Sequence, residues 1–198
     1  MITYLDGKLA YKDPAYVIID VGGVGYQVRI SLQTYSSLQG SERCKLHTYL
    51  SIREDAHTLY GFFEMEERTL FLDLISVSGI GPNTALVMLS SLSSSEIKYA
   101  IMVENLKVIQ GIKGIGAKTA QRVILELKDK LKKENYTTGT TAGTNIPTLA
   151  NNTVRNEALS ALVTLGIARN VAEKSIEAIL KKEGDQVTLE QLIKLALR

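Results

Sequence analysis

The sequence predicts a multidomain α+β protein with three parts: an N-terminal five-stranded OB-fold barrel, a central all-α domain with two helix-hairpin-helix motifs, and a C-terminal three-helix, UBA-like module. Short β-branched and aromatic runs fill the first third of the 198 residues, and a Gly-Ile-Gly motif recurs after 35 residues in the middle third. A Thr- and Gly-rich stretch then precedes three amphipathic segments. The expected boundaries are 1–64 for the barrel, 65–134 for the central domain, 135–152 for a flexible linker and 153–198 for the tail.

The first domain is expected to be β throughout, with its strands separated by Gly, Asp, Pro and Ser. Five short strands favour a small closed barrel over a sandwich, which usually needs about seven. The glycine-rich run 21–26 lacks the spacing and the βαβ context of a dinucleotide site, so we interpret it as a turn between paired strands. The predicted strands are Ile2–Lys8, Tyr16–Asp20, Gly25–Ile30, Lys45–Ile52 and His57–Phe63.

A predicted hairpin tip between the fourth and fifth strands carries two adjacent carboxylates, Glu54 and Asp55. Two interpretations are open at this point. Acidic residues are common at solvated turns. If the barrel sits on DNA, however, these carboxylates would repel phosphates and push strands apart.

The central domain contains an internal repeat in which residues 77–85 align with residues 112–120, and five of the nine positions coincide. The glycines permit a tight turn and a close approach, while the following helix offers unpaired N–H groups and a partial positive charge. Such a site suits a phosphate, and two in tandem could hold one phosphate from each strand of a duplex without reading its bases. The isoleucines are expected to fill the gap between helices. The candidate DNA-binding residues are Gly79, Ile80, Gly81, Asn83, Thr84, Lys113, Gly114, Ile115, Gly116, Lys118, Thr119 and Arg122.

The helical periodicity predicts five helices in the central domain and three in the tail. Ser95 or a neighbouring serine is expected to cap the third of these, and Asn105 to close it. Leu162, Leu165, Ile167 and Ile176 could belong to the core of the tail or to a partner surface. The predicted ranges are Glu66–Ile75, Thr84–Leu92, Glu96–Val103, Leu106–Ile109, Ala117–Lys133, Val154–Leu165, Arg169–Lys182 and Thr188–Leu197.

Positive charge is concentrated in the central segment. Residues 65–133 hold ten Lys and Arg against seven Asp and Glu, compared with six against seven in 1–64 and seven against seven in 134–198. A phosphate-binding region requires such an excess, although segments that bind nothing also show it. The run 111–119 is similar to a P-loop, but Ala117 separates the last glycine from Lys118, which argues against an ATP site.

The remaining composition predicts neither a cofactor nor a membrane anchor. Cys44 is the single cysteine, which excludes a disulfide framework, and two histidines do not make a zinc pattern. No apolar run approaches the roughly twenty residues that span a bilayer, and no signal-peptide profile follows Met1. We therefore expect a cytoplasmic protein without a membrane partner.

The order of barrel, paired hairpins, linker and tail resembles the RuvA family, over nearly the whole chain. The segments that carry the resemblance, besides the two hairpins, are Val21-Gly22-Gly23-Val24-Gly25-Tyr26, Arg53-Glu54-Asp55-Ala56, Leu59-Tyr60-Gly61-Phe62 and Glu67-Arg68-Thr69-Leu70-Phe71.

This resemblance implies a non-catalytic subunit that holds a four-way Holliday junction open and square for branch migration, in recombination, DNA repair and the SOS response. It implies a homotetramer, or an octamer of two facing tetramers, with the tail bound to the hexameric ATPase RuvB and the resolvase RuvC reached through the complex. Glu54 and Asp55 match the family's acidic pin, which would gather eight carboxylates at the crossover.

The hairpins depart from the family pattern at a few positions. Family members often carry a lysine where Asn83 stands, and a proline and a lysine where Lys113 and Ala117 stand. The resemblance therefore implies that the first hairpin relies on its backbone N–H groups and an uncharged amide. Lys118, Arg122 and Lys113 of the second hairpin would then supply more of the attraction to DNA.

Two other classes of function are weighed against this one. A helix-hairpin-helix repair enzyme, such as a glycosylase or nuclease, would place a catalytic Lys or Asp just past a hairpin. The nearest such carboxylate, Asp129, lies in a lysine-rich helix end. A protein-interaction scaffold would show no affinity for DNA.

Overall fold

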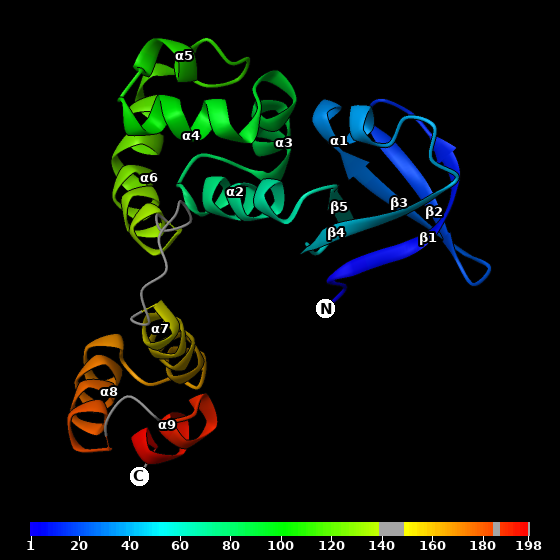
Figure 1. The fold of residues 1–198 in the computed structure, drawn as a ribbon. Coiled ribbons are helices and arrows are strands. Elements are labelled where there is room, and N and C mark those ends of the chain that lie inside the picture. Colours follow the sequence, from blue (N-terminus) through cyan, green and yellow to red (C-terminus); the bar gives the residue numbers. More distant parts are fainter. Residues whose placement is uncertain (139–148, 184–186, 198) are drawn as a thin grey trace. The chain divides into compact units, whose positions relative to one another are not determined.

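A computed structural model of the chain describes residues 1–138, 149–183 and 187–197. These residues form two compact units, one before and one after residues 139–148 (Figure 1). Within the described residues, the first unit holds five strands and six helices and the second holds three helices.

The five strands close into a barrel in the order β1-β2-β3-β5-β4, which confirms the predicted class. Neighbouring strands are antiparallel except β3 and β5, which pair in parallel. Alternate residues such as Val17 and Ile19 point inward and are fully buried, as the period of a half-buried strand requires. The strands are β1 Tyr4–Lys12, β2 Tyr16–Val21, β3 Val24–Ile30, β4 Arg43–Ile52 and β5 His57–Phe62.

Two glycines allow the barrel wall to close. A Cβ at Gly7 would lie 2.2 Å from the carbonyl oxygen of Asp20, and one at Gly61 would lie 2.5 Å from Cγ1 of Val28 on the parallel neighbour β3. Any larger residue would push these strands apart.

The glycine-rich run 21–26 is the turn that the sequence predicts. Val21 pairs with Val24 across the β2–β3 hairpin, and the two residues between them, Gly22 and Gly23, both have positive φ (63° and 90°). Positive φ at both central positions is the requirement of the turn that matches strand twist.

A short helix, α1 (Leu32–Ser37), follows β3 where the sequence predicts only strands and loops. The Ser31 hydroxyl caps it by accepting from the backbone N–H of Thr34. Six residues, two of them serines, give no helical period, so the helix depends on this cap and on tertiary contacts. One such contact joins the N–H of Leu32 to the Ser90 hydroxyl of the helical domain, 3.2 Å away.

Five helices follow the barrel close to their predicted positions. Ser93, a neighbour of the expected Ser95, forms a capping box with Glu96. Asn105 closes the preceding helix through its backbone, because its N–H donates to the carbonyl of Ala100 at 2.8 Å. Its side chain accepts from the N–H of Val108 and so also caps the next helix. The helices are α2 Met65–Ser76, α3 Pro82–Ser91, α4 Ser94–Met102, α5 Leu106–Gln110 and α6 Ala117–Thr138.

Both ends of the expected linker, 135–152, are helical. Helix α6 continues to Thr138, and α7 begins at Leu149. The centre of the expected linker, 139–148, lies outside the described residues.

An aromatic cluster joins the barrel to the helical domain within the first unit. The ring centroid of Phe71 in α2 lies 4.8 Å from that of Phe62, 5.4 Å from Tyr60 and 5.5 Å from Tyr49 on the barrel. Tilted rings at these separations add to the free energy of area burial. Tyr60 and Phe62 of β5 therefore belong to the core of the helical domain, beside the separate core inside the barrel.

Hydrogen bonds from two adjacent residues of α2 strengthen this joint. The Glu67 carboxylate accepts from the hydroxyls of Ser31 and Thr34, with the Thr34 oxygen 2.7 Å away. Next to it, Nε of Arg68 donates to the carbonyl of Thr48 in β4 at 2.8 Å. Both α1 and β4 are thereby fastened to α2.

Glu67 predicts a measurable pH dependence. Burial raises the pKa of its carboxyl above the ordinary 4.5, although bonds from Ser31, Thr34 and the N–H of Phe63 partly offset this and the nearby Glu64 adds to it. The folded state thus holds this proton more tightly than the unfolded state. The contribution of Glu67 to the free energy of unfolding should therefore fall as the pH rises from about 4.5 through the raised folded pKa.

Glutamine does not ionise, so Glu67→Gln should not show this pH-dependent fall. The free energy of unfolding of the variant should therefore rise relative to that of the parent over this pH window. Chemical denaturation at several pH values and one protein concentration measures the difference. A constant difference from pH 4 upward would contradict the raised pKa.

The second unit is a three-helix module. It consists of α7 Leu149–Thr164, α8 Arg169–Glu183 and α9 Leu189–Ala196. Leu162 and Ile176 are buried in its core, Ile167 packs against that core, and Leu165 is 63% exposed. Of the four residues that the sequence could not assign, three therefore belong to the core of the module and Leu165 lies on its surface. In the described part of the chain, no helix has the length and apolar content needed to cross a membrane.

Candidate nucleic-acid interface

The two hairpins share one backbone geometry, 35 residues apart. In the first, the N–H of Ile80 donates to the carbonyl of Val77 at 3.1 Å, and in the second the N–H of Ile115 donates to that of Ile112 at 3.1 Å. The helices that leave the hairpins start alike as well, because Ala85 bonds to Gly81 at 3.0 Å and Ala120 to Gly116 at 2.9 Å. The sequence repeat is therefore a structural repeat.

The first glycine of each hairpin has a left-handed backbone, with φ of 96° at Gly79 and 91° at Gly114. Residues with a Cβ rarely adopt this conformation, so the turn itself requires glycine. The side chains of Ile80 and Ile115 are 4% and 5% exposed and belong to the helical core. They hold the hairpin helices together, as expected, while the backbone around them faces outward.

The second glycine of each hairpin leaves the following helix open to approach. Gly81 is the N-cap of α3 and has no side chain with which to cap its N–H groups. A Cβ at Gly81 or at Gly116 would meet nothing within 4 Å. In the described residues, no side chain caps the N–H groups at the start of α3, and the space beside both helix starts is open, where the helix dipole favours an anion.

The two hairpins lie next to each other. The guanidinium of Arg122 in α6 donates to the carbonyl of Ser78 at 3.1 Å, across to the first hairpin. A Cβ on Gly79 would lie 3.9 Å from the hydroxyl of Thr119 in the second. This adjacency brings the predicted phosphate-binding turns onto one surface.

The predicted cations are in different states. Lys113 and Lys118 are exposed, and no ion pair engages either of them in the part of the chain that the structure describes. Arg122 already has partners within the protein, because it donates to the carbonyl of Ser78 and its Nε lies 3.9 Å from Oε1 of Glu126. The two lysines are therefore better placed than Arg122 to bind an external phosphate.

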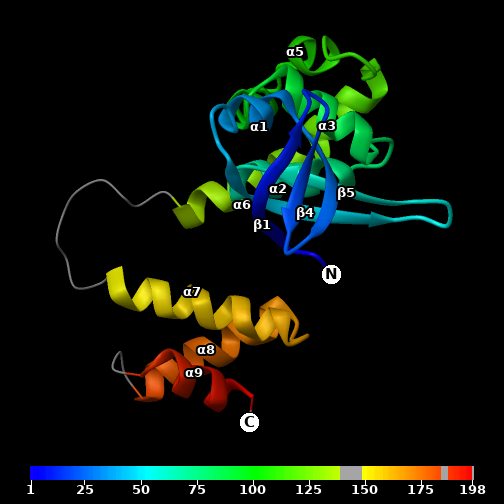
Figure 2. The same ribbon diagram turned by 90° about the vertical axis from the view of Figure 1, so that its right-hand side faces the viewer.

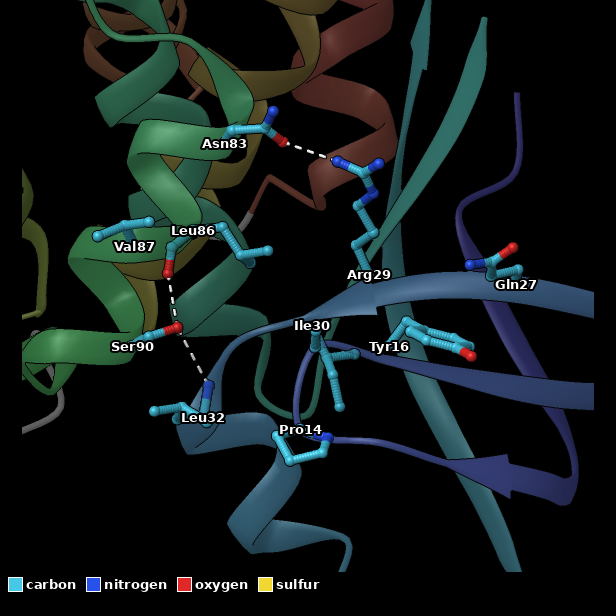
Figure 3. A pocket seen from close by; sticks show the side chains of 11 residues that line it. Pro14, Tyr16, Gln27, Arg29, Ile30, Leu32, Asn83, Leu86, Val87 and Ser90 are labelled. Carbon is cyan, nitrogen blue, oxygen red and sulfur yellow. Dashed lines mark hydrogen bonds between the residues drawn. The ribbon is translucent and has the colours of Figure 1, made fainter. Parts of the chain in front are cut away.

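The first hairpin has a cation nearby that the sequence did not reveal. Oδ1 of Asn83 accepts from Nη1 of Arg29 at 3.0 Å and from the buried Tyr60 hydroxyl at 3.0 Å. Figure 3 shows Arg29 reaching from β3 of the barrel to Asn83 at the start of α3. The guanidinium thus stands beside a helix start that has no basic residue of its own. Thr84 follows in the first turn and is partly exposed.

Arg29 and Asn83 border an open groove between the barrel and α3 (Figure 3). The groove has a volume of about 600 Å³ and is otherwise lined mainly by apolar side chains. Nothing in residues 24–30 alone distinguishes Arg29 from any outward-facing strand residue. Its importance arises only when β3 packs next to α3.

The acidic tip forms the end of the β4–β5 hairpin. Pairing of the two strands reaches Ile52 and His57, and the N–H of Arg53 donates to the carbonyl of Ala56 at 2.9 Å. Glu54 and Asp55, between them, are exposed. Figure 2 shows this hairpin, in cyan, projecting beyond the barrel, so the two carboxylates stand at the end of an extended arm.

Curated proteins are similar in sequence to this chain over its full length. A protein of Cytophaga hutchinsonii is 54% identical over 198 residues, covering 100% of this chain and 99% of the relative. Relatives in Bacteroides fragilis and Flavobacterium psychrophilum are 50% and 48% identical over 201 and 198 residues, with the same coverage. All three are named Holliday junction branch migration complex subunit RuvA. The chain belongs to the RuvA family.

The family's parts fall on the observed units. Residues 1–61 match the RuvA N terminal domain and cover the barrel with its acidic tip. Residues 71–129 match a SAM-like helix-hairpin-helix tandem, which includes both hairpins. Residues 153–198 match the RuvA C-terminal domain, which is the three-helix unit. The resemblance inferred from the motifs is therefore confirmed for the whole RuvA arrangement.

Proposed function

We propose that this member of the RuvA family binds four-way junction DNA, holds it open and presents it to the ATPase RuvB for branch migration in recombination and repair. One observation carries the proposal: two hairpins of closely similar backbone geometry lie side by side with their helix starts open. Each can hold a phosphate of one strand, so the pair fits a duplex arm. Such contacts carry no base information, which suits a protein that acts on any sequence.

The proposed DNA-binding residues are those of the two open turns and the cations around them. The glycines and Thr84 and Thr119 offer backbone or hydroxyl donors, and Lys113 and Lys118 offer free charge. Arg122 holds the hairpins together in addition to any phosphate contact, because it already donates to Ser78.

Selectivity for junctions follows from repetition in a homotetramer. One subunit gripping one arm binds weakly, but four arms bound together gain from effective concentration. Exposed apolar side chains on the barrel, among them Tyr4 at 55% and Ile52 at 67%, support self-association of this domain. An octamer of two facing tetramers is the alternative assembly, and sedimentation with and without junction DNA distinguishes the two.

The tail is proposed to bind RuvB, with RuvC reached through the assembled complex. Its surface keeps several large apolar side chains exposed, including Leu165 at 63%, Val171 at 52% and Leu197 at 53%. A small module with such a surface suits a protein partner better than a polyanion. The subunit itself is proposed to be non-catalytic and cytoplasmic, with ATP hydrolysis supplied by RuvB.

A gel-shift comparison tests the proposal. The full chain is titrated against an immobile four-way junction and against a linear duplex of equal arm length, with and without Mg²⁺. We expect at least about 100-fold tighter binding to the junction, because linked arms gain by avidity. Equal affinity for both would overturn the proposal. Cleaved DNA or an excised base on a denaturing gel would instead indicate a repair enzyme, and no binding at all a protein scaffold.

Arg29 is expected to supply the charge that the first hairpin lacks. Arg29→Ala should weaken junction binding and lower the salt slope by about 0.9 per bound subunit, the contribution of one phosphate. Adding Asn83→Lys to Arg29→Ala should restore both quantities, because a cation returns to the hairpin. Arg43→Ala, which removes an exposed arginine from β4, is the matched control. A slope that Arg29→Ala leaves unchanged would remove Arg29 from the interface.

A further inference from the structure

Helix α2 carries two buried carboxylates that face different domains. Glu67 is 6% exposed and Asp73 is 3% exposed. Asp73 pairs with Lys130 of α6, so its bond stays within the helical domain. Glu67 accepts hydrogen bonds from the hydroxyls of Ser31 and Thr34, at the start of the small helix α1 attached to the barrel.

The hydrogen-bond network around Glu67 has one consistent arrangement. The Ser31 hydroxyl accepts from the N–H of Thr34 at 3.0 Å, and the Thr34 hydroxyl accepts from the N–H of Phe63 at 3.1 Å. Each hydroxyl then has its single proton left to donate, and both donate to Glu67. The carboxylate is the acceptor that completes both chains.

Burying the Glu67 carboxylate costs free energy, and what it provides in return is a joint of defined orientation. No lysine, arginine or histidine forms an ion pair with Glu67 in the described ranges, so burying its charge is offset only by these hydrogen bonds. The aromatic cluster around Phe71 already supplies apolar attraction between the domains. Apolar contacts tolerate small rotations, whereas two hydrogen bonds to one carboxylate permit little.

Glu67 and Arg68 hydrogen-bond to the parts of the barrel that determine the position of the acidic tip. Arg68 bonds to Thr48 in β4, the strand that runs out to Glu54 and Asp55. Helix α2, on the other side, leads directly into the first hairpin. The rotation of the barrel on α2 therefore sets where the tip stands relative to the phosphate-binding turns.

We infer that Glu67 is a positioning residue: its paired hydrogen bonds to Ser31 and Thr34 fix the acidic tip relative to the two hairpins, and selectivity for four-way junctions over single duplexes depends on them. This rests on the proposed function. A duplex needs only one pair of hairpins and is indifferent to the tip. A junction is bound at four arms and at the crossover at the same time. A change in the orientation of the barrel on α2 would be repeated in every subunit and would disturb all of these contacts together.

The test compares affinity for the four-way junction with affinity for the linear duplex in matched variants of the full chain. Glu67→Ala should lower the ratio about tenfold, with duplex affinity within about twofold of the parent, because only the simultaneous engagement of arms is lost. Glu67→Gln keeps one acceptor oxygen, so its junction-to-duplex affinity ratio should lie between those of the parent and of Glu67→Ala. Asp73→Ala removes an equally buried carboxylate from the same helix and should leave the ratio unchanged, even where it lowers the melting temperature.

A second measurement reports the joint without DNA. Spin labels at Ala56→Cys, beside the tip, and Gln121→Cys, in α6, give a distance distribution when diluted with unlabelled protein, since the native Cys44 is buried. The parent should give a narrow distribution, and Glu67→Ala one at least about twofold broader. If Glu67→Ala does not fold, Thr34→Val removes one of the two donors and serves in both measurements.

An unchanged affinity ratio together with an unchanged distribution would overturn the inference. A parent protein that shows no preference for the junction would instead overturn the proposed function, and the distance distributions would still decide whether Glu67 fixes the joint.

Discussion

Lys118→Ala is expected to lower the affinity for a four-way junction roughly tenfold or more at moderate salt, whatever the DNA sequence. Lys118 lies in the first turn of α6, exposed and without an ion pair in the described residues, beside the open helix start at Gly116. Its charge is therefore available to a phosphate and releases a counterion on binding.

The slope of log K against log salt should flatten by about 0.9 for each bound subunit, or about 3.6 for four. Titrations at several salt concentrations measure it. Lys174→Ala is the matched control, since it removes an equal charge from an exposed position in the three-helix unit. A parallel shift of affinity without a change of slope would mean that Lys118 acts on the fold and not on a phosphate.

Neutralising the acidic tip should have the opposite effect on binding. Glu54→Gln with Asp55→Asn should leave junction affinity unchanged or raise it, up to about tenfold at low salt, because the exposed carboxylates repel phosphates. The gain should disappear as salt rises, since exposed charges are screened. The rate of branch migration with RuvB should change, because the repulsion that separates strands at the crossover is lost.

A strand-exchange assay in the presence of RuvB and ATP follows that rate, and gel shifts at two salt concentrations follow the affinity. Glu42→Gln, at an exposed position elsewhere on the barrel, controls for net charge. Loss of junction binding in the double variant would show that the tip is structural.

The features that the sequence predicted are those specified over short distances. Strand alternation marks the barrel, and the hairpins are visible because a left-handed glycine at Gly79 and Gly114 and a plug isoleucine next to it are required within a few residues. The sequence also placed both carboxylates of the tip on one turn, as the structure has them.

The features that it missed depend on residues far apart in the chain. Helix α1 has too few residues to show a period and is stabilised by Ser31 and by the contact of Leu32 with Ser90. Asn105 ends α4 with its backbone N–H, as predicted, and its side chain also caps the helix that begins after it. Arg29 reaches Asn83 across 54 residues, and no local pattern could indicate that contact.

The bond between Arg29 and Asn83 also limits how far the helical domain is a transferable module. Residues 77–91, the first hairpin and its outgoing helix, contain no lysine or arginine, so the guanidinium at Asn83 comes from the barrel. An excised segment 65–134 would keep both turns and Arg122 but would lose the guanidinium that bonds to Asn83. Transplanted into another protein, it would hold the two strands of a duplex unequally until a cation is restored at position 83.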